Sequence, residues 1–407
     1  MAQYPSYKDS GFDWIGQIPS HWGLLKSKVL WRESFNTSAT GTEDLLSVSQ
    51  YEGVTPANGS RSESLVGYKV VEENNLVINI MLAWMGGLGV SAYNGLVSPA
   101  YCVYKLQGDS NPKYMHYLYK TPMYLAEFAR HSTGVIPSRW RMYTDDFGQV
   151  LTLIPPRKEQ DAMVAYLDAA TAKIDEAIAQ QQRMIDLLNE RKELLIENEV
   201  TKGIKNGTWK TRRLRHVCKF RNGYTPSKNV TAYWENGTIP WFRMEDIHLY
   251  GRKLSQSEHY ITPSAVKGDG LFKAGSFILA TSATVGEHAL LLVDALSNQR
   301  FTNLALFEEL SNELSTEYFF YFLYHIDREC RGFTNGSTFA SVSNQDLKNI
   351  LVGIPSPEEQ RRIVSMLDTE TFKIDNALEL VSQQIQFLQE RKQIMINDVV
   401  TGTVKVV

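Results

Sequence analysis

The chain has 407 residues, of which 43% are hydrophobic and 21% charged, and its formal net charge at pH 7 is −3. This composition fits a globular protein of two or three domains and argues against disorder. The polar beginning and the absence of an apolar run of roughly 18 residues argue against a signal peptide and a membrane span. We therefore expect a cytoplasmic protein without membrane contact.

The charge is unevenly distributed along the chain. The negative charge falls in residues 158–206 and 358–407, whereas residues 1–157 are neutral and residues 207–357 are weakly basic. Contact with DNA needs only one locally positive face, so this distribution permits a nucleic-acid ligand without requiring one.

Residues 1–157 predict a mixed α/β domain. The runs LVINIMLAW and SPAYCVYKL are typical of strands, and NPKYMHYLYKTPMYLAEFARH indicates a helix. A polar loop follows, with Ser138, Arg139, Trp140 and Arg141 just before a further strand. Because arginines beside an aromatic ring in a loop can contact base edges and phosphates, Ser138, Arg139 and Arg141 are candidate DNA contacts. The alternative is a solvated loop whose tryptophan packs on the domain.

Residues 158–206 predict a long helix. Apolar residues recur at alternating steps of three and four, which is the spacing of a coiled-coil seam. The predicted seam includes Leu167, Ile174, Ile178, Ile185 and Leu188. Two prolines, 155 and 156, precede the helix, and Gly203 with Asn206 and Gly207 is expected to end it and turn the chain.

Residues 207–357 resemble the first domain in length and texture. The run SFILATSATVGEHALLLVD indicates strands, STEYFFYFLYHIDREC indicates a helix, and a polar loop beginning RGFTNGSTFASV follows. By the same chemistry we choose as candidate base or phosphate contacts Lys228, Arg331, Asn335 and Ser337. A solvated or structural role is the alternative for each of them.

Residues 358–407 repeat the first long helix. From Pro155 and from Pro355 the two stretches align without a gap at an offset of 200 residues, and they share Glu159/Glu359, Gln160/Gln360 and the runs 190–192 and 390–392. The second seam includes Leu367, Ile374, Leu378, Ile385 and Leu388. Ser356, Pro357 and Glu359 predict a capped helix start. Since two like units related by a pseudo-two-fold axis place their helices head to tail, we expect an antiparallel coiled coil.

Three patterns imitate catalytic sites, and each has a stronger structural interpretation. Glu190 and Lys192, with Asp175 upstream, have the spacing of a metal-dependent nuclease, but they lie inside the predicted coiled coil. Residues 111–114 (NPKY) are close to the loop of amino-methyltransferases, but a lysine takes the apolar position and Asn-Pro commonly starts a helix. The glycines of GGLG follow a strand without the expected helix. The histidines and cysteines have no metal-ligand spacing, and we expect the cysteines to be buried thiols.

Together, two domains that each open near a tryptophan, the motifs GYTPSKN, YWENGTIPW and SNQRFTNLALF, and the repeated Pro-x-x-x-Glu-Gln resemble the specificity subunit of type I restriction-modification systems. The resemblance implies target-recognition domains at 1–157 and 207–357, each reading half of a split DNA site. It also implies that the helices of 158–206 and 358–407 form an antiparallel coiled coil, which sets the spacing of the two domains and docks two methyltransferase subunits.

The resemblance further implies double-stranded DNA as ligand and allows restriction or translocase subunits as additional partners. S-adenosylmethionine, ATP and magnesium would belong to partner subunits, with no metal, cofactor or catalysis in this chain. Two other functions remain open from the residues alone. One is a coiled-coil scaffold that joins two non-DNA ligands, and the other is a self-contained DNA modification enzyme.

Overall fold

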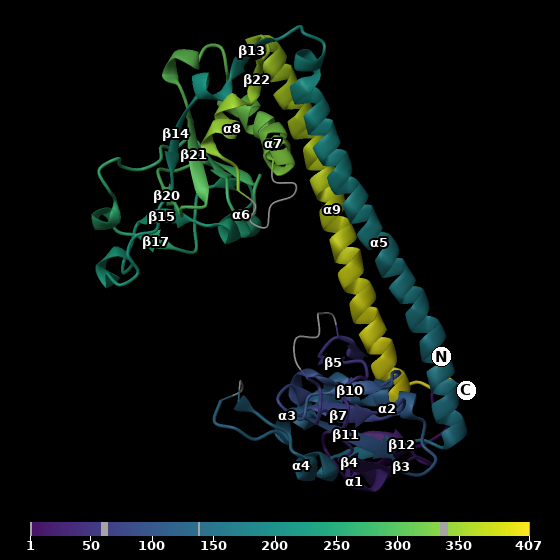
Figure 1. Cartoon of the computed structure of the whole chain (residues 1–407). Helices are drawn as coiled ribbons and strands as arrows, with labels where there is room; N and C mark the ends of the chain where they lie inside the picture. Colours follow the sequence, from purple (N-terminus) through teal and green to yellow (C-terminus); the bar gives the residue numbers. More distant parts are fainter. Residues whose placement is uncertain (1, 58–63, 137–138, 334–340, 407) are drawn as a thin grey trace. The chain divides into compact units, whose positions relative to one another are not determined.

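The computed structural model describes residues 2–57, 64–136, 139–333 and 341–406. Contacts divide the chain into two compact units, one of Met1–Gln182 with Gln383–Val407 and the other of Arg183–Ser382. The two long helices, α5 (Arg157–Lys205) and α9 (Pro357–Val400), each contribute one part to each unit (Figure 1). Each unit therefore contains one of the two predicted domains and a part of both helices.

The first unit is built on a four-stranded antiparallel sheet of order β4-β11-β8-β9, with β4 (Trp31–Ser34), β11 (Tyr101–Leu106), β8 (Leu76–Asn79) and β9 (Leu88–Val90). Four antiparallel pairs accompany it: β12 (Leu151–Ile154) with β3 (Gly23–Lys26), β5 (Leu46–Ser49) with β6 (Gly53–Pro56), β7 (Lys69–Val71) with β10 (Gly95–Val97), and β1 (Tyr7–Asp9) with β2 (Gln17–Pro19). The short helices are α1 (Ser27–Leu30), η1 (Ala83–Met85) and α4 (Thr144–Gln149).

The single helix predicted over residues 111–131 is wrong, because the structure has two helices there, α2 (Pro112–Tyr119) and α3 (Pro122–Arg130). The break follows from local chemistry: Pro122 has no N–H to continue α2, and the Thr121 hydroxyl accepts a hydrogen bond from Tyr124 N. The interpretation of Asn111 as a helix start is confirmed. Its side chain accepts hydrogen bonds from Lys113 N and Tyr114 N.

The second unit repeats the strand order of the main sheet and adds one strand to it. Its main sheet has the order β14-β21-β18-β19-β16, with β14 (Cys218–Asn222), β21 (Phe301–Leu306), β18 (Phe277–Ala280), β19 (His288–Leu291) and β16 (Lys253–Leu254), the last added in parallel to β19. A smaller sheet holds β17 (Tyr260–Ile261), β15 (Ile239–Phe242) and β20 (Leu296–Ser297), and β13 (Lys210–Arg213) pairs with β22 (Leu351–Ile354). The helices are α6 (Met244–Tyr250), α7 (Thr316–Phe333) and α8 (Asn344–Asn349), with η3 (Leu214–His216), η4 (Thr231–Tyr233), η5 (Pro263–Ala265) and η6 (Glu308–Leu310).

Aromatic side chains dominate both cores. In the first unit, Tyr119, Tyr124 and Phe128 from α2 and α3 are fully buried, and in the second unit so are Tyr318 and Phe319 of α7. Burying one such ring stabilises the fold by about 1.5 to 3 kcal/mol.

The prediction of buried thiols is right for two cysteines, 218 and 330, whereas Cys102 is only half-buried. Among the described residues, no helix is both long and apolar enough to cross a membrane.

Within each unit, α5 and α9 run antiparallel. In the first unit, Lys392 Nζ binds Asp175 Oδ1 at 2.6 Å, and Leu167 packs in one cluster with Val399. In the second unit, Lys192 Nζ binds Asp375 Oδ1 at 2.6 Å, and Val200 packs in one cluster with Leu367. In both units, higher numbers on α5 therefore meet lower numbers on α9. The predicted seam residues are all buried or half-buried: Leu167, Ile174, Ile178, Ile185, Leu188, Leu367, Ile374, Leu378, Ile385 and Leu388.

The residues that imitate a nuclease belong to this helix pairing. Lys192 and Lys392 each bind an aspartate of the other helix, so the two lysines and Asp175 and Asp375 form two equivalent ion pairs. Among the described residues, no group of three or more His, Cys, Asp or Glu side chains is placed to hold a metal ion.

The predicted end of the first helix and the turn at Asn206 and Gly207 are confirmed, but Gly203 itself does not end the helix. Helix α5 continues to Lys205, and Gly203 lies inside it, where a Cβ would come 2.0 Å from the Trp209 ring. Gly203 therefore permits Trp209, the residue before β13, to pack closely on the helix. The chain turns at Gly207, whose φ of +72° is in the left-handed region.

Candidate nucleic-acid interface

The loop between α3 and α4 carries the first set of candidate contacts. Two backbone hydrogen bonds close it, from Thr133 N to Arg141 O at 3.0 Å and from Arg141 N to Thr133 O at 2.9 Å. Met142 N then donates to Ile80 O at 3.0 Å, which ties the loop to the end of β8. The loop is tight, since a Cβ on Gly134 would lie 2.5 Å from Arg139 O. Ser138 lies outside the described residues, so its role stays a prediction.

The two arginines of this loop have different environments. Arg139 is exposed, and its backbone N–H donates to Ile136 O at 2.8 Å. Arg141 is half-buried, and its Nη1 is buried without a hydrogen-bond partner among the described residues. A buried N–H without an acceptor costs about 1 to 3 kcal/mol, so Arg141 is suited to an acceptor supplied by a ligand.

Trp140 is held against the domain. Its ring lies 5.3 Å from the ring of Trp84 in η1, at an interplanar angle of 67°. The alternative interpretation of the loop predicted such packing for the tryptophan. The ring pair anchors the middle of the loop while Arg139, one residue earlier, stays exposed.

The second domain has an equivalent loop between α7 and α8. Its far end is fixed by the hydrogen bond from Val342 N to Thr281 O at 2.9 Å, in the manner of Met142 and Ile80 in the first domain. Asn335 and Ser337 lie outside the described residues, and their roles stay predictions. The placement of Arg331 in the loop is wrong, because α7 extends to Phe333. Arg331 Nη2 lies 3.7 Å from Glu193 Oε1 of α5.

Lys228 lies between β14 and η4 of the second domain. It lines a cavity of about 360 Å³ together with Thr231, Trp234, Trp241, Arg243 and His259. Of these six residues, only Lys228 is predicted from the sequence as a DNA contact. The stretch YWENGTIPW, which contains Trp234 and Trp241, is interpreted there only as a family motif. The residues come from η4 and its flanks, from β15 and the residue after it, and from the turn before β17, and no period in the sequence relates them.

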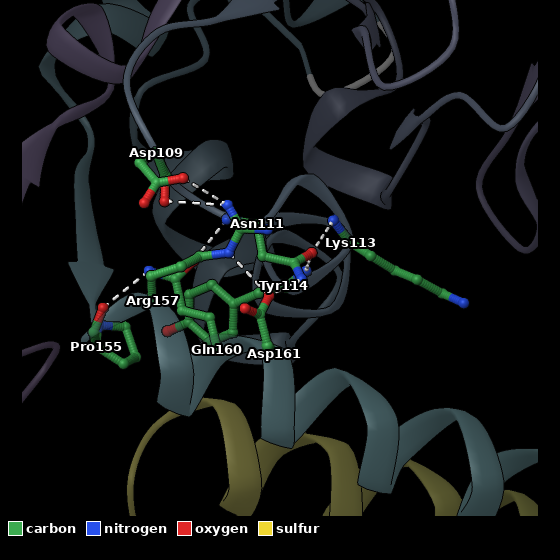
Figure 2. A network of polar contacts seen from close by, with 8 residues as sticks. All are labelled: Asp109, Asn111, Lys113, Tyr114, Pro155, Arg157, Gln160 and Asp161. Carbon is green, nitrogen blue, oxygen red and sulfur yellow. Dashed lines mark hydrogen bonds and ion pairs between the residues drawn. The ribbon is translucent and has the colours of Figure 1, made fainter.

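The repeated glutamine connects the first domain to α5. The Gln160 side chain is 1% exposed; its Nε2 donates to Pro155 O at 2.8 Å and its Oε1 accepts from Asn111 N at 2.7 Å. Around it, Asn111 Nδ2 donates to Asp161 at 2.7 Å, and Arg157 binds Asp161 at 2.8 Å (Figure 2). The hydrogen bond from Arg157, followed by that from Asn111, lowers the pKa of Asp161. This network fixes α2 to the first turn of α5.

The second domain has the same connection at α9. Gln360, 2% exposed, donates from Nε2 to Pro355 O at 2.9 Å and to Glu313 O at 2.6 Å, and its Oε1 accepts from Ser315 N at 2.8 Å. The Ser356 hydroxyl caps the helix by accepting from Glu359 N at 3.2 Å. Pro-x-x-x-Glu-Gln is thus the sequence of a rigid domain-to-helix connection, used twice.

A tyrosine in each domain also binds the end of the other long helix. Tyr114 Oη lies within hydrogen-bond distance of Val400 O of α9 at 3.1 Å, and Tyr318 Oη of Val200 O of α5 at 3.4 Å. Each domain therefore contacts the start of one helix and the end of the other, within its own unit.

Each unit also exposes an apolar strip on a long helix. In the second unit Leu187 and Leu194 of α5 are 60% and 44% exposed, and in the first unit Phe387 and Ile394 of α9 are 65% and 61% exposed. Residues seven apart lie on one face of a helix, and the two pairs occupy positions 200 residues apart. We call these pairs the α5 strip and the α9 strip. Exposed apolar groups of this kind commonly mark protein interfaces.

This chain is similar in sequence to a known family of proteins. Residues 206–389 match the family described as the type I restriction modification DNA specificity domain. The chain is 44% identical over 162 residues to the type I restriction enzyme EcoprrI specificity subunit of Escherichia coli, covering 38% of this chain and 40% of that one. It is 28% identical over 188 residues to the MjaIX specificity subunit of Methanocaldococcus jannaschii, covering 45% and 41%. The alignments thus span about two fifths of the length of these curated relatives.

Two further similarities cover more of the chain. A second type I specificity subunit of Escherichia coli is 27% identical over 296 residues, which covers 66% of this chain and 68% of that one. A chain in a solved structure that concerns complex assembly and conformational transition of the type I R-M system superposes with a TM-score of 0.67. That superposition covers 94% of this chain and 98% of the other at 16% identity, and it shows a shared fold.

Proposed function

We propose that this chain, which belongs to the specificity-subunit family of type I restriction-modification systems, binds double-stranded DNA at a bipartite site, with one half-site read by each domain. The observation that carries the proposal is the duplication itself. Two domains that share the order of four sheet strands are each fixed to the two long helices by equivalent glutamine and tyrosine contacts. Duplicated readers suit two half-sites of one duplex.

Reading is assigned to the loops and basic side chains of the two domains. In the first domain Arg139 is exposed and Arg141 has an N–H without a hydrogen-bond partner among the described residues. In the second domain Lys228 and Arg331 supply positive charge. Arginine pairs with guanine through two hydrogen bonds, and phosphate contacts add affinity that depends on salt rather than on sequence.

The coiled coil sets the distance between the half-sites and docks two methyltransferase subunits. The α5 strip and the α9 strip support two equivalent docking positions, because they are the same helix surface repeated at an offset of 200 residues. The subunits that bind there would bring S-adenosylmethionine, while restriction or translocase subunits would bring ATP and magnesium. In this proposal the chain itself performs no catalysis.

A domain exchange tests the bipartite reading. Residues 1–150 are replaced by the matching segment of a relative, the chimera is expressed with its methyltransferase, and methylated sites are mapped across the genome. We expect one half-site to change and the other to stay. A change in both halves would contradict the proposal.

A second experiment separates the alternatives. Gel shifts on random duplexes are run with the chain alone and with its methyltransferase, together with methylation and cleavage assays. Sequence-specific binding with modification only in the complex supports the adaptor. Modification by the isolated chain would indicate a self-contained enzyme, and no DNA binding by the complex would indicate a scaffold for other ligands.

A further inference from the structure

The second domain contains a cavity of about 360 Å³ lined by Lys228, Thr231, Trp234, Trp241, Arg243 and His259. This volume is within the range of roughly 300 to 1,000 Å³ that is usual for small-ligand sites. All six residues are described and belong to the second unit. Three aromatic rings and two cations in one cavity call for a ligand that is both planar and negatively charged.

The aromatic rings hold one another in place, and Trp234 and His259 stay partly exposed, whereas Trp241 is only 4% exposed. Trp234 and Trp241 meet edge to face at 5.1 Å, and His259 stacks on Trp241 at 6.3 Å with an angle of 23°. The indole N–H groups are already satisfied, since Trp241 donates to Tyr224 O at 2.9 Å and Trp234 to Ser227 O at 3.1 Å. What the rings still offer a ligand is stacking, which every nucleobase can use.

The cations are placed for an anion. Arg243 Nε is buried and has no hydrogen-bond partner among the described residues, and its ion pair with Glu245 spans 3.8 Å from Nε to Oε2. A buried N–H group without an acceptor in the protein is suited to a hydrogen bond with an acceptor that a ligand supplies. Lys228 is exposed at the rim, where its charge adds to that of Arg243.

The cavity adjoins a polar turn that the first domain does not share. Asn298 N donates to Phe242 O at 3.1 Å, directly before Arg243, and the exposed Gln299 and Arg300 follow. At the offset of 200 residues the first domain has Ser98, Pro99 and Ala100. The basic and aromatic character of this site therefore belongs to the second domain.

We propose that the cavity binds a single nucleotide of the DNA whose base has left the helical stack. The base stacks on the partly exposed ring of Trp234, and its phosphate lies between Lys228 and Arg243. Within a duplex the faces of a base are covered by its neighbours, so a concave site that offers an aromatic ring suits an unstacked nucleotide rather than a groove edge. This inference rests on the proposed DNA-binding function and names one contact site for it.

The test uses the full chain in complex with its methyltransferase. Affinity is measured for the fully paired target duplex and for the same duplex with one mismatched, unpaired nucleotide placed in turn at each position in and beside the half-site read by the second domain. Unpairing removes part of the cost of extrusion, so at one position the wild-type complex should bind the mismatched duplex more tightly. Trp234→Ala should abolish that gain and weaken binding there by about 5- to 150-fold. Trp234→Phe should retain it.

Two more variants distinguish a loss of ligand binding from a loss of folding. Lys228→Ala with Arg243→Gln should weaken binding to the mismatched duplex and reduce its dependence on salt. Lys273→Ala, an exposed lysine of the same domain paired with Asp294, is the control and should bind like wild type. The inference is overturned if no position shows the gain, or if Trp234→Ala retains it. It is also overturned if Trp234→Ala releases the methyltransferase, which would indicate a peptide ligand. Failure of the wild-type complex to bind its paired target would count against the proposed function instead.

Discussion

At the scale of single residues, the two loop arginines make separable contributions. Arg141 Nη1 is buried and has no hydrogen-bond partner in the part of the chain that the structure describes, whereas Arg139 is exposed. Arg141 is therefore placed for one defined acceptor and Arg139 for a mobile contact. Trp140 between them is fixed against Trp84.

We predict that Arg141→Ala relaxes discrimination at one position of the first half-site by about 1 to 3 kcal/mol, because a bidentate contact to a base is lost. Arg139→Ala should weaken binding to all sequences alike and reduce its salt dependence, because a phosphate contact is lost. Competition binding to half-site variants at several salt concentrations measures both. Lys105→Ala, whose lysine pairs with Glu72, is the control. If both arginine variants methylated the same sites at the same rate, the assignment would be wrong.

The buried glutamines give a stability prediction. Replacing Gln160 or Gln360 by leucine removes the amide and leaves a buried backbone N–H and carbonyl without partners. We expect each change to lower the free energy of unfolding by roughly 2 to 4 kcal/mol. Urea unfolding measures it, with the exposed Gln386→Leu as control, for which a change within about 0.5 kcal/mol is expected. Equal stability of all three variants would mean that the network does not hold the domains.

His116 predicts a loss of stability in mild acid. Its burial, followed by the charges of Lys120 and Lys113, lowers its pKa from the ordinary 6.5 to about 4. Its Nδ1 lies 3.1 Å from Val90 N and accepts that hydrogen bond in the neutral state. The folded state prefers the neutral ring, so the full stability is present above about pH 6.5 and is lost as the pH falls through 4. We expect a loss on the order of 2 to 3 kcal/mol over this window.

Urea unfolding between pH 4 and 7 measures this loss. His116→Gln should flatten the dependence on pH, whereas replacement of the exposed His248 by glutamine should leave it as in wild type. A His116→Gln protein with the wild-type slope would show that other groups cause the loss.

At the scale of elements, the exposed strips are the feature of α5 and α9 that their pairing leaves unexplained. Seam positions are covered by the partner helix, but Leu187, Leu194, Phe387 and Ile394 are not. Apolar side chains repeated at seven-residue spacing on an outer face are typical of a surface that another protein covers.

We predict that changing both residues of one strip to aspartate removes one of the two methyltransferase subunits that we propose to dock there, because a charge cannot be desolvated in an apolar interface. The α5 strip variant and the α9 strip variant should each form a complex with one methyltransferase, and the combined variant none. Light scattering after gel filtration gives the stoichiometry. Asp186→Ala, next to Leu187 but on another face of α5, is the control. Two subunits bound to the combined variant would refute this docking surface.

At the scale of the whole molecule, the distance between half-sites is the property at issue. Each long helix is continuous between the two units, without a flexible linker at the point where the units divide. The unspecified gap in the DNA site should therefore be a fixed number of base pairs.

A heptad added near Gln181 and another in the partner region near Val381 keep the seam in phase and lengthen both helices by about 10 Å. At about 3.4 Å per base pair, we predict that the preferred gap grows by up to about 3 base pairs while both half-sites stay the same. Methylation mapping in cells that carry the lengthened protein measures the gap. An active protein with the original gap would mean that the helices do not set it.

Periodic and repeated signals in the sequence determined the elements. A seam of apolar residues from Leu167 to Leu188, repeated from Leu367 to Leu388, fixes two long helices and their pairing, because a coiled coil buries a pattern that is local along each chain. The helix start at Asn111 was predictable for the same reason, since its cap lies within three residues. The break at Thr121 and Pro122 also had a local signal, which the hydrophobic pattern on either side obscured.

Only the tertiary structure decided which distant residues meet. Gln160 accepts a hydrogen bond from Asn111 N, 49 positions away, and Lys192 forms an ion pair with Asp375 rather than with a neighbour on its own helix. The cavity around Trp234 is assembled from a loop, a strand and a turn whose spacing carries no period. Such contacts depend on how elements pack, and packing is decided by side-chain volume and by the satisfaction of buried polar groups across the whole domain.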